Sequence, residues 1–196
     1  MSLGRELKSH NALTDEIHAI GISADGVKVI TAVGAKNLKV WNIVTGKDVC
    51  DIKADSIVNC VATSPDGRYA VAGSMDNCVR VWDMETTELV MTLRGHTDHV
   101  DALHVTHDLI FTGSSDHTMR SYDVVTGEPK GVFKGHSGAI TAICASPMQT
   151  RISSLSPDIR PCSPLKGTQS KYVFKRIDTF MFRDMASTLY CCCHIL

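Results

Sequence analysis

The chain has 196 residues, of which 43% are hydrophobic, and a formal net charge of −1. This length fits one domain, and the hydrophobic content supports a packed core, so extensive disorder is not expected. A charge this close to zero gives no reason to expect nucleic acid, which favours clustered lysine and arginine. No apolar run resembles a secretory signal or a membrane span, so we expect an intracellular, cytoplasmic protein.

The cysteine pattern points to the same compartment. Cys50, Cys60, Cys78 and Cys144 each stand singly within an apolar segment, and no C-x-x-C pair occurs among them. This spacing favours small buried thiols in a reducing environment over a disulfide framework or a zinc site.

Short apolar segments bounded by turn residues predict three successive groups of four strands. The first group covers residues 17–23, 27–32, 37–42 and 47–53, the second 57–64, 68–74, 78–83 and 88–93, and the third 99–106, 109–114, 118–123 and 130–134. The segment GRELKSHNAL at 4–13 aligns with 127–136 and predicts an earlier strand. A first strand of a fourth group is predicted at 139–145.

The three groups repeat one another along the chain. Asp25-Gly26 precedes Asp66-Gly67 by 41 residues, Trp41 precedes Trp82 by 41, and Trp82 precedes Tyr122 by 40. A period of about 40–45 residues with strand signals predicts one small four-stranded sheet per repeat. Together with ordered Gly-His, Ser-Pro-Asp-Gly, Gly-Ser-x-Asp and Trp-Asp signals at fixed offsets, this period resembles the WD-repeat β-propeller family over residues 4–147.

The resemblance implies an all-β fold, a partial and open β-propeller of four-stranded antiparallel blades. We assign residues 1–147 to the array, with a strand of a preceding blade at 4–13, blades at about 14–54, 55–95 and 96–135, and the first strand of a fourth at 136–147. After residue 147 the sequence turns to serine and proline, so we predict a divergent, poorly ordered tail at 148–196.

The resemblance also implies a hydrogen-bonded tetrad of histidine, hydroxyl, aspartate and tryptophan in each ideal blade, because buried polar groups need partners. The third blade matches it at His96, Thr112 and Asp116, with Tyr122 in the tryptophan position, where the relocated donor leaves the fourth bond open. The second blade retains Asp76 and Trp82, the first retains Trp41 alone, and the fourth begins with His136.

His96, Asp116 and Thr112 also have the chemistry of a base, its orienting carboxylate and a nucleophile. Their recurrence at the repeat period favours a buried structural role instead. Three further histidines between residues 99 and 107 would be splayed across both faces of a strand and its turn, which disfavours a metal site. We therefore predict no enzymatic activity, no cofactor and no bound metal.

The family resemblance implies a non-enzymatic scaffold or adaptor that binds other proteins through the loops between blades and the turns between the second and third strands of a blade. The residues expected there are Met75, Asn77, Thr97, Asp98, Ser115 and His117.

Two alternatives remain open. The chain could be a truncated or alternative isoform of a larger WD-repeat protein without independent activity, since three complete blades are fewer than propellers need, and its open blade faces could self-associate. The sequence Cys193-His194-Ile195-Leu196 fits a C-a-a-X signal, so prenylation of Cys193 would give a lipid-anchored form that binds membranes.

Overall fold

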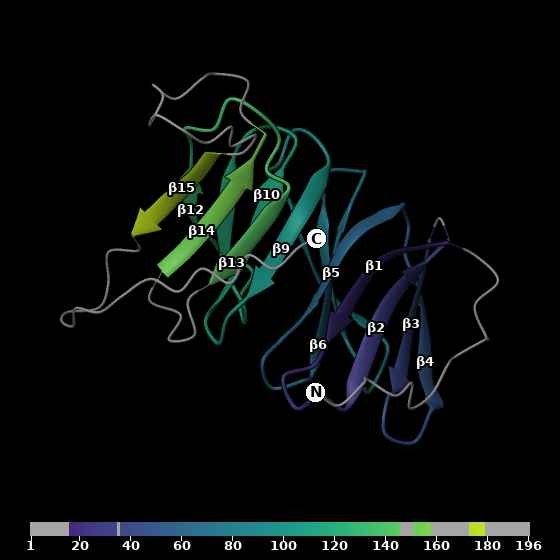
Figure 1. The fold of residues 1–196 in the computed structure, drawn as a ribbon. Coiled ribbons are helices and arrows are strands. Elements are labelled where there is room, and N and C mark those ends of the chain that lie inside the picture. Colours follow the sequence, from purple (N-terminus) through teal and green to yellow (C-terminus); the bar gives the residue numbers. More distant parts are fainter. Residues whose placement is uncertain (1–15, 35, 146–150, 158–172, 179–196) are drawn as a thin grey trace, which may run out of the picture.

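The computed structural model describes residues 16–34, 36–145, 151–157 and 173–178. These residues form fifteen β-strands in four antiparallel sheets (Figure 1). The four sheets are open, which confirms the predicted all-β fold of separate propeller blades. Within the described ranges, no helix is long and apolar enough to cross a membrane.

We call the four sheets blades one to four. Blade one contains β1 (Ile17–Ile22), β2 (Lys28–Val33), β3 (Asn37–Asn42) and β4 (Lys47–Lys53). Blade two contains β5 (Val58–Thr63), β6 (Tyr69–Ser74), β7 (Val79–Asp83) and β8 (Leu89–Leu93). Blade three contains β9 (Val100–Val105), β10 (Leu109–Ser114), β11 (Met119–Asp123) and β12 (Pro129–Phe133). Blade four contains β13 (Ala142–Ala145), β14 (Arg151–Ser156) and β15 (Val173–Asp178).

The turn between the first two strands of a blade shows why the sequence folds into hairpins. In blade two, Ser64 Oγ accepts the Tyr69 N–H at 2.8 Å, and Asp66 Oδ1 accepts the Arg68 N–H at 3.0 Å. Gly67 supplies the positive φ of 70° that closes the turn without a steric penalty. The same serine, aspartate and glycine chemistry recurs 41 residues earlier in blade one.

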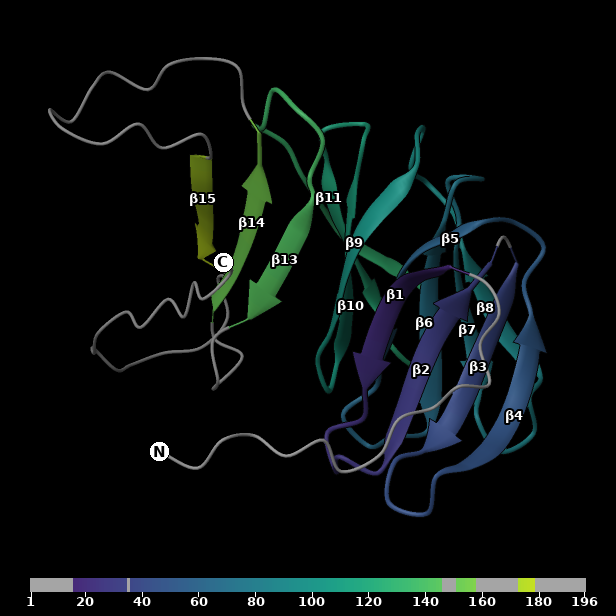
Figure 2. The ribbon, with the colours of Figure 1, turned by 45° about the vertical axis from the view of Figure 1, so that its right-hand side comes forward.

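Successive blades pack face to face. The first strands contact one another in order, β1 with β5, β5 with β9 and β9 with β13, and Figure 2 shows the sheets fanned about them. We call the side of a blade that faces the preceding blade its near face, and the opposite side its far face. The near face carries Trp82 in blade two and Tyr122 in blade three.

Three hydrophobic clusters fill the spaces between the blades. The first cluster packs Leu38, Val40 and Ile52 of blade one against Ala72 and Trp82 of blade two. The second packs Val71 and Val81 of blade two against Ile110 and Tyr122 of blade three. The third packs Phe111 and Met119 of blade three against Ile140 and Ile152. Each blade is therefore stabilised by burying its apolar faces against its neighbours.

Blade four extends further than the sequence composition indicated. Residues 151–156 were predicted to belong to a poorly ordered tail, but they form β14, which pairs with β13 and with β15. Ile152 and Ser154 are each 1% exposed, because they face blade three. The alternation of buried residues outweighs the serine-rich composition. The strand predicted at 4–13 lies outside the described residues.

Close packing between blades gives one stability prediction at Gly113 of β10. A Cβ at this position would lie 2.5 Å from Cγ2 of Ile140, and such overpacking costs about 1–3 kcal/mol. We expect Gly113→Ala to lower the free energy of unfolding by that amount in urea denaturation. Gly21→Ala is the matched control, because the nearest atom to its Cβ would be Val61 O at 3.5 Å. Equal losses in the two variants would contradict the described packing.

Candidate functional site

A buried polar chain anchors one end of blade three. The side chain of His96 is 1% exposed, with Nδ1 2.8 Å from Asp116 Oδ2 and Nε2 2.7 Å from Thr112 Oγ1. Burial lowers the pKa of His96 and outweighs the opposing effect of the Asp116 carboxylate, so the imidazole is neutral at pH 7. Its Nδ1–H then donates to Asp116, and Nε2 accepts the Thr112 hydroxyl proton.

Asp116 is the acceptor at the centre of this chain. Burial alone would raise its pKa, but hydrogen bonds from Thr118, His96 and the Thr97 N–H outweigh burial and lower the pKa to about 2. The carboxylate is therefore ionised and ties the loop before β9 to the turn between β10 and β11.

Tyr122 makes a different bond from the one a tryptophan would supply. Its hydroxyl donates to the Arg94 carbonyl at 3.2 Å, while Thr112 bonds His96. Blade three thus has a three-residue polar chain and a separate tyrosine bond to the preceding segment. The fourth bond of the tetrad, which the sequence left open, is therefore made by the Tyr122 hydroxyl to the Arg94 carbonyl and not to Thr112.

Blade two replaces the missing histidine with an arginine. Arg80 forms a two-pronged ion pair with Asp76, with Nη2 2.6 Å from Oδ2 and Nη1 3.2 Å from Oδ1, and its side chain is 7% exposed. Ala54 occupies the histidine position. The sequence analysis missed Arg80, although an arginine two residues before the buried Trp82 was its signal.

Blades one and four each contain a pair that the sequence analysis did not assign. Trp41 Nε1 donates to Thr31 Oγ1 at 3.2 Å, so blade one retains two members of the tetrad and not Trp41 alone. The signal was the 41-residue spacing from Thr31 to the hydroxyl position of blade two. In blade four His136 Nε2 lies 2.8 Å from Ser154 Oγ. Ser154 was missed because its strand was assigned to the tail.

The loop residues expected to bind partners gather at the end of the sheets that this polar chain supports. The Thr97 N–H donates to Asp116 Oδ2 at 3.1 Å, and the Asp98 carbonyl accepts the Ser114 hydroxyl at 3.0 Å. The Ser115 N–H donates to the His99 carbonyl at 2.9 Å. The loop before β9 and the turn after β10 are therefore held together.

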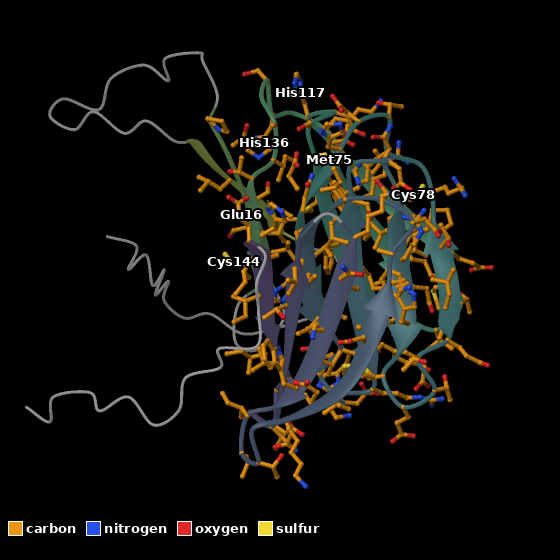
Figure 3. The ribbon with its side chains drawn as sticks, turned by 90° about the vertical axis from the view of Figure 1, so that its right-hand side faces the viewer. Glu16, Met75, Cys78, His117, His136 and Cys144 are labelled. Carbon is orange, nitrogen blue, oxygen red and sulfur yellow. The ribbon has the colours of Figure 1, made fainter. Side chains whose placement is uncertain are left out.

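Two tight turns project side chains from this end. Met75 is 41% exposed and His117 is also exposed, and Figure 3 shows both at the same end of the sheets. Asn77 and His117 have φ values of 67° and 68°, in the left-handed region that few residues other than glycine and asparagine favour. We call Met75, Asn77, Thr97, Asp98, Ser115 and His117 the loop surface.

A second polar link runs between blades two and three beside the loop surface. Irregular register in the first strands marks bulges at Asn59 and Asp101. Asp101 accepts a hydrogen bond from Asn59 Nδ2 at 3.1 Å and from Ser115 Oγ at 2.6 Å. The sequence analysis missed both residues, although their 42-residue spacing follows the repeat. This link fixes the position of one blade's loops relative to the next.

Clusters of metal-binding side chains and the state of the thiols can be examined in the described part of the chain. No three histidine, cysteine or acidic side chains there are grouped as metal ligands. Burial raises the pKa of Cys60 to about 12, which keeps its thiol protonated and unreactive. Cys144 is exposed and so differs from the expected buried thiols. Cys193 lies outside the described residues, so its prenylation stays a prediction.

Comparison with known families agrees with this architecture. The WD40 profile, described as "WD domain, G-beta repeat", matches residues 46–83, 87–123 and 127–158, which together exceed half of the chain. The chain therefore belongs to the WD-repeat family. The third matched segment includes β14, in agreement with its place in blade four.

Curated relatives are similar over parts of their length. Autophagy-related protein 16 of Arabidopsis thaliana is 26% identical over 55% of this chain and 21% of its own length. The DENN domain and WD repeat-containing protein SCD1 of the same plant is 26% identical over 78% of this chain and 13% of its own length. Coatomer subunit beta'-2 of Arabidopsis thaliana is 37% identical over 35% and 8%. The chain thus spans a minor part of these relatives.

Solved structures show the same fold. The crystal structure of the RRP9 WD40 repeats matches 76% of this chain and 50% of that chain, with a TM-score of 0.64 and 20% identity. The computationally designed Ika4 protein matches 90% of this chain and 99% of that chain, with a TM-score of 0.70 and 24% identity.

Proposed function

We propose that this chain is a non-enzymatic scaffold or adaptor that binds a protein partner through the loop surface. The observation that carries the proposal is the convergence of these loops on one end, where the buried Asp116 holds two of them in place. A rigid base lowers the entropic cost of presenting exposed side chains to a partner. Membership of the WD-repeat family and similarity to a subunit of coatomer support protein partners.

The composition of the loop surface indicates what it would contact. Met75 is a flexible apolar side chain that adapts to different apolar partners. Thr97 and His117 are exposed and offer hydrogen-bonding groups, while the exposed Asp98 carries a negative charge. The surface therefore suits a protein segment that places an apolar side chain on Met75 and a donor near Asp98.

Quantitative affinity capture tests this proposal. The immobilised chain is compared with a Met75→Asp, His117→Gly variant, in which glycine keeps the left-handed backbone of residue 117. We expect partner recovery to fall about tenfold or more, as for the loss of a central interface contact. Val44→Asp with Val125→Asp is the matched control, because these side chains are 66% and 78% exposed in turns at the opposite end. Equal losses in both variants would contradict the proposal.

The fragment alternative is favoured by the limited share of each relative that the chain covers. In that case the chain would be a truncated or alternative isoform of a larger WD-repeat protein, without independent activity. A purified chain that is polydisperse and readily cleaved within residues 16–145 would support it, whereas a uniform, protease-resistant species would not. We also propose that the chain is located in the cytoplasm.

The lipid-anchored alternative depends on the C-a-a-X-like sequence at Cys193. Expression of the chain and its Cys193→Ser variant in the same cells tests it. An unchanged distribution between membrane and supernatant fractions would reject prenylation as the anchor.

A further inference from the structure

The near face of blade one is open. Ile20 of β1 is opposite Thr31 of β2, and Val61 of β5 is opposite Ala72 of β6. Ile20 therefore occupies in blade one the position that Val61 occupies in blade two. Val61 is half-buried against blade one, whereas Ile20 is 63% exposed and Ile22 is 57% exposed. The isoleucines of β1 thus occupy contact positions of a blade interface, with nothing among the described residues that buries them comparably.

The far face of blade four is open in the complementary way, as far as the described part of the chain extends. Ala142 of β13 pairs with Leu155, as Ala102 of β9 pairs with Gly113 in blade three. Ala102 is 4% exposed, whereas Ala142 is exposed. Blade four therefore presents the kind of surface that blade three buries beneath β13.

These two open faces are the two halves of an interface that the chain already forms three times. The chain presents one half at each end of its array. Its similarity to the RRP9 WD40 repeats extends over 50% of that chain, so the four blades correspond to about half of that fold. A second copy supplies both missing halves at once.

We propose that two copies of this chain associate head to tail, with the near face of blade one in each copy packed on the far face of blade four in the other. Two copies of four blades give a ring of eight, within the range of about 4–8 blades in propellers. Contacts between unlike faces close into a ring when the rotation is complete.

This assembly is separate from partner binding by the loop surface. It buries the exposed apolar side chains of β1 without changing the loops. A loss of partner capture and a loss of association are therefore distinguishable outcomes.

One position makes the new interface differ from the internal ones. Gly73 and Gly113 lie against Val100 and Ile140 of the following blade. Leu155 takes the equivalent place in blade four, so it would meet β1 of the other copy with a larger side chain. Leu155→Ala, which recreates the Ala32 of blade one, should keep or tighten the dimer. General apolar association would instead be weakened by removing the leucine.

Sedimentation velocity and light scattering of the full chain test the proposal. We expect the wild-type chain to have twice the mass of one copy. Ile20→Lys and Ala142→Lys should each raise the dissociation constant about tenfold or more, because each places a charge in both interfaces. Val49→Lys is the matched control and should remain dimeric, since Val49 is 44% exposed on the fourth strand of blade one.

Mixing the two lysine variants gives the most specific result. A mixed dimer has one interface with both substitutions and one with neither, so mixing Ile20→Lys with Ala142→Lys should restore part of the association. Circular dichroism melts confirm that each variant folds. A wild-type monomer at all concentrations, open filaments, a dimer insensitive to Ala142→Lys, or a dimer weakened by Leu155→Ala would each overturn the proposal.

Discussion

Replacing His96 by alanine is expected to lower the free energy of unfolding by about 3 kcal/mol. The substitution removes the shared partner of the Asp116 carboxylate and the Thr112 hydroxyl. The side chain of Asp116 is only 5% exposed, so water has little access to replace the lost bond. A cavity of the size of the imidazole adds to the loss. Urea denaturation followed by circular dichroism measures the change, with the slope of the transition unchanged.

His99→Ala is the control for this result. His99 lies three residues further along, its side chain is 46% exposed, and its carbonyl bond to Ser115 is made by the backbone. Its replacement should change stability by less than about 0.5 kcal/mol. A loss at residue 96 no larger than the loss at residue 99 would show that the polar chain contributes little to the fold.

Replacing Arg80 by alanine is expected to cost about 2 kcal/mol. The guanidinium makes two hydrogen bonds to Asp76, and the pKa of Asp76 is lowered because these contacts outweigh its burial. Removing the arginine leaves that partly buried carboxylate without its ion pair, with a hydrogen bond from the Cys78 N–H remaining. Arg80→Lys should recover part of the stability, because lysine keeps the charge but cannot form the planar two-pronged contact. Thermal and urea unfolding of the three proteins give the comparison.

Arg68→Ala provides the matched control in the same blade. Arg68 also pairs with a carboxylate, Asp83, at 2.9 Å, but its side chain is 59% exposed. Without Arg68, Asp83 keeps the hydrogen bonds from the Glu85 and Thr86 N–H groups, so the expected loss is below about 1 kcal/mol. Equal losses of stability from Arg68→Ala and Arg80→Ala would show that burial of the Arg80 side chain does not strengthen its ion pair.

Local turn chemistry explains why the first three blades could be predicted from the sequence. Serine, aspartate and glycine form the same bonds in the turns before β2 and β6, and Thr106 accepts the Leu109 N–H in the shorter turn before β10, so strand positions follow the repeat. The observed strands of blades one to three lie within two residues of the predicted boundaries. Burial of alternating residues then fixes which face of each strand meets its neighbour.

Other features depend on neighbours that a repeat alignment does not reveal. Arg80 lies in the third strand of blade two, whereas the histidine it replaces belongs to the loop before the first strand, and its contact with Asp76 depends on the reach of its side chain across the turn. β14 was hidden by serines whose burial against blade three is a property of the folded array. The Asp101 link required two bulges, each of which re-aims one side chain out of register.

The left-handed backbone at Asn77 and His117 divides the loop surface into two kinds of position. At these two residues the main chain itself restricts the choice to side chains that tolerate a positive φ. Met75 and Thr97 are exposed and have ordinary backbone conformations, so they can change without disturbing the turns. Related chains with different partners would therefore differ mainly at positions 75 and 97, whereas positions 77 and 117 would keep residues that tolerate the geometry of the turn.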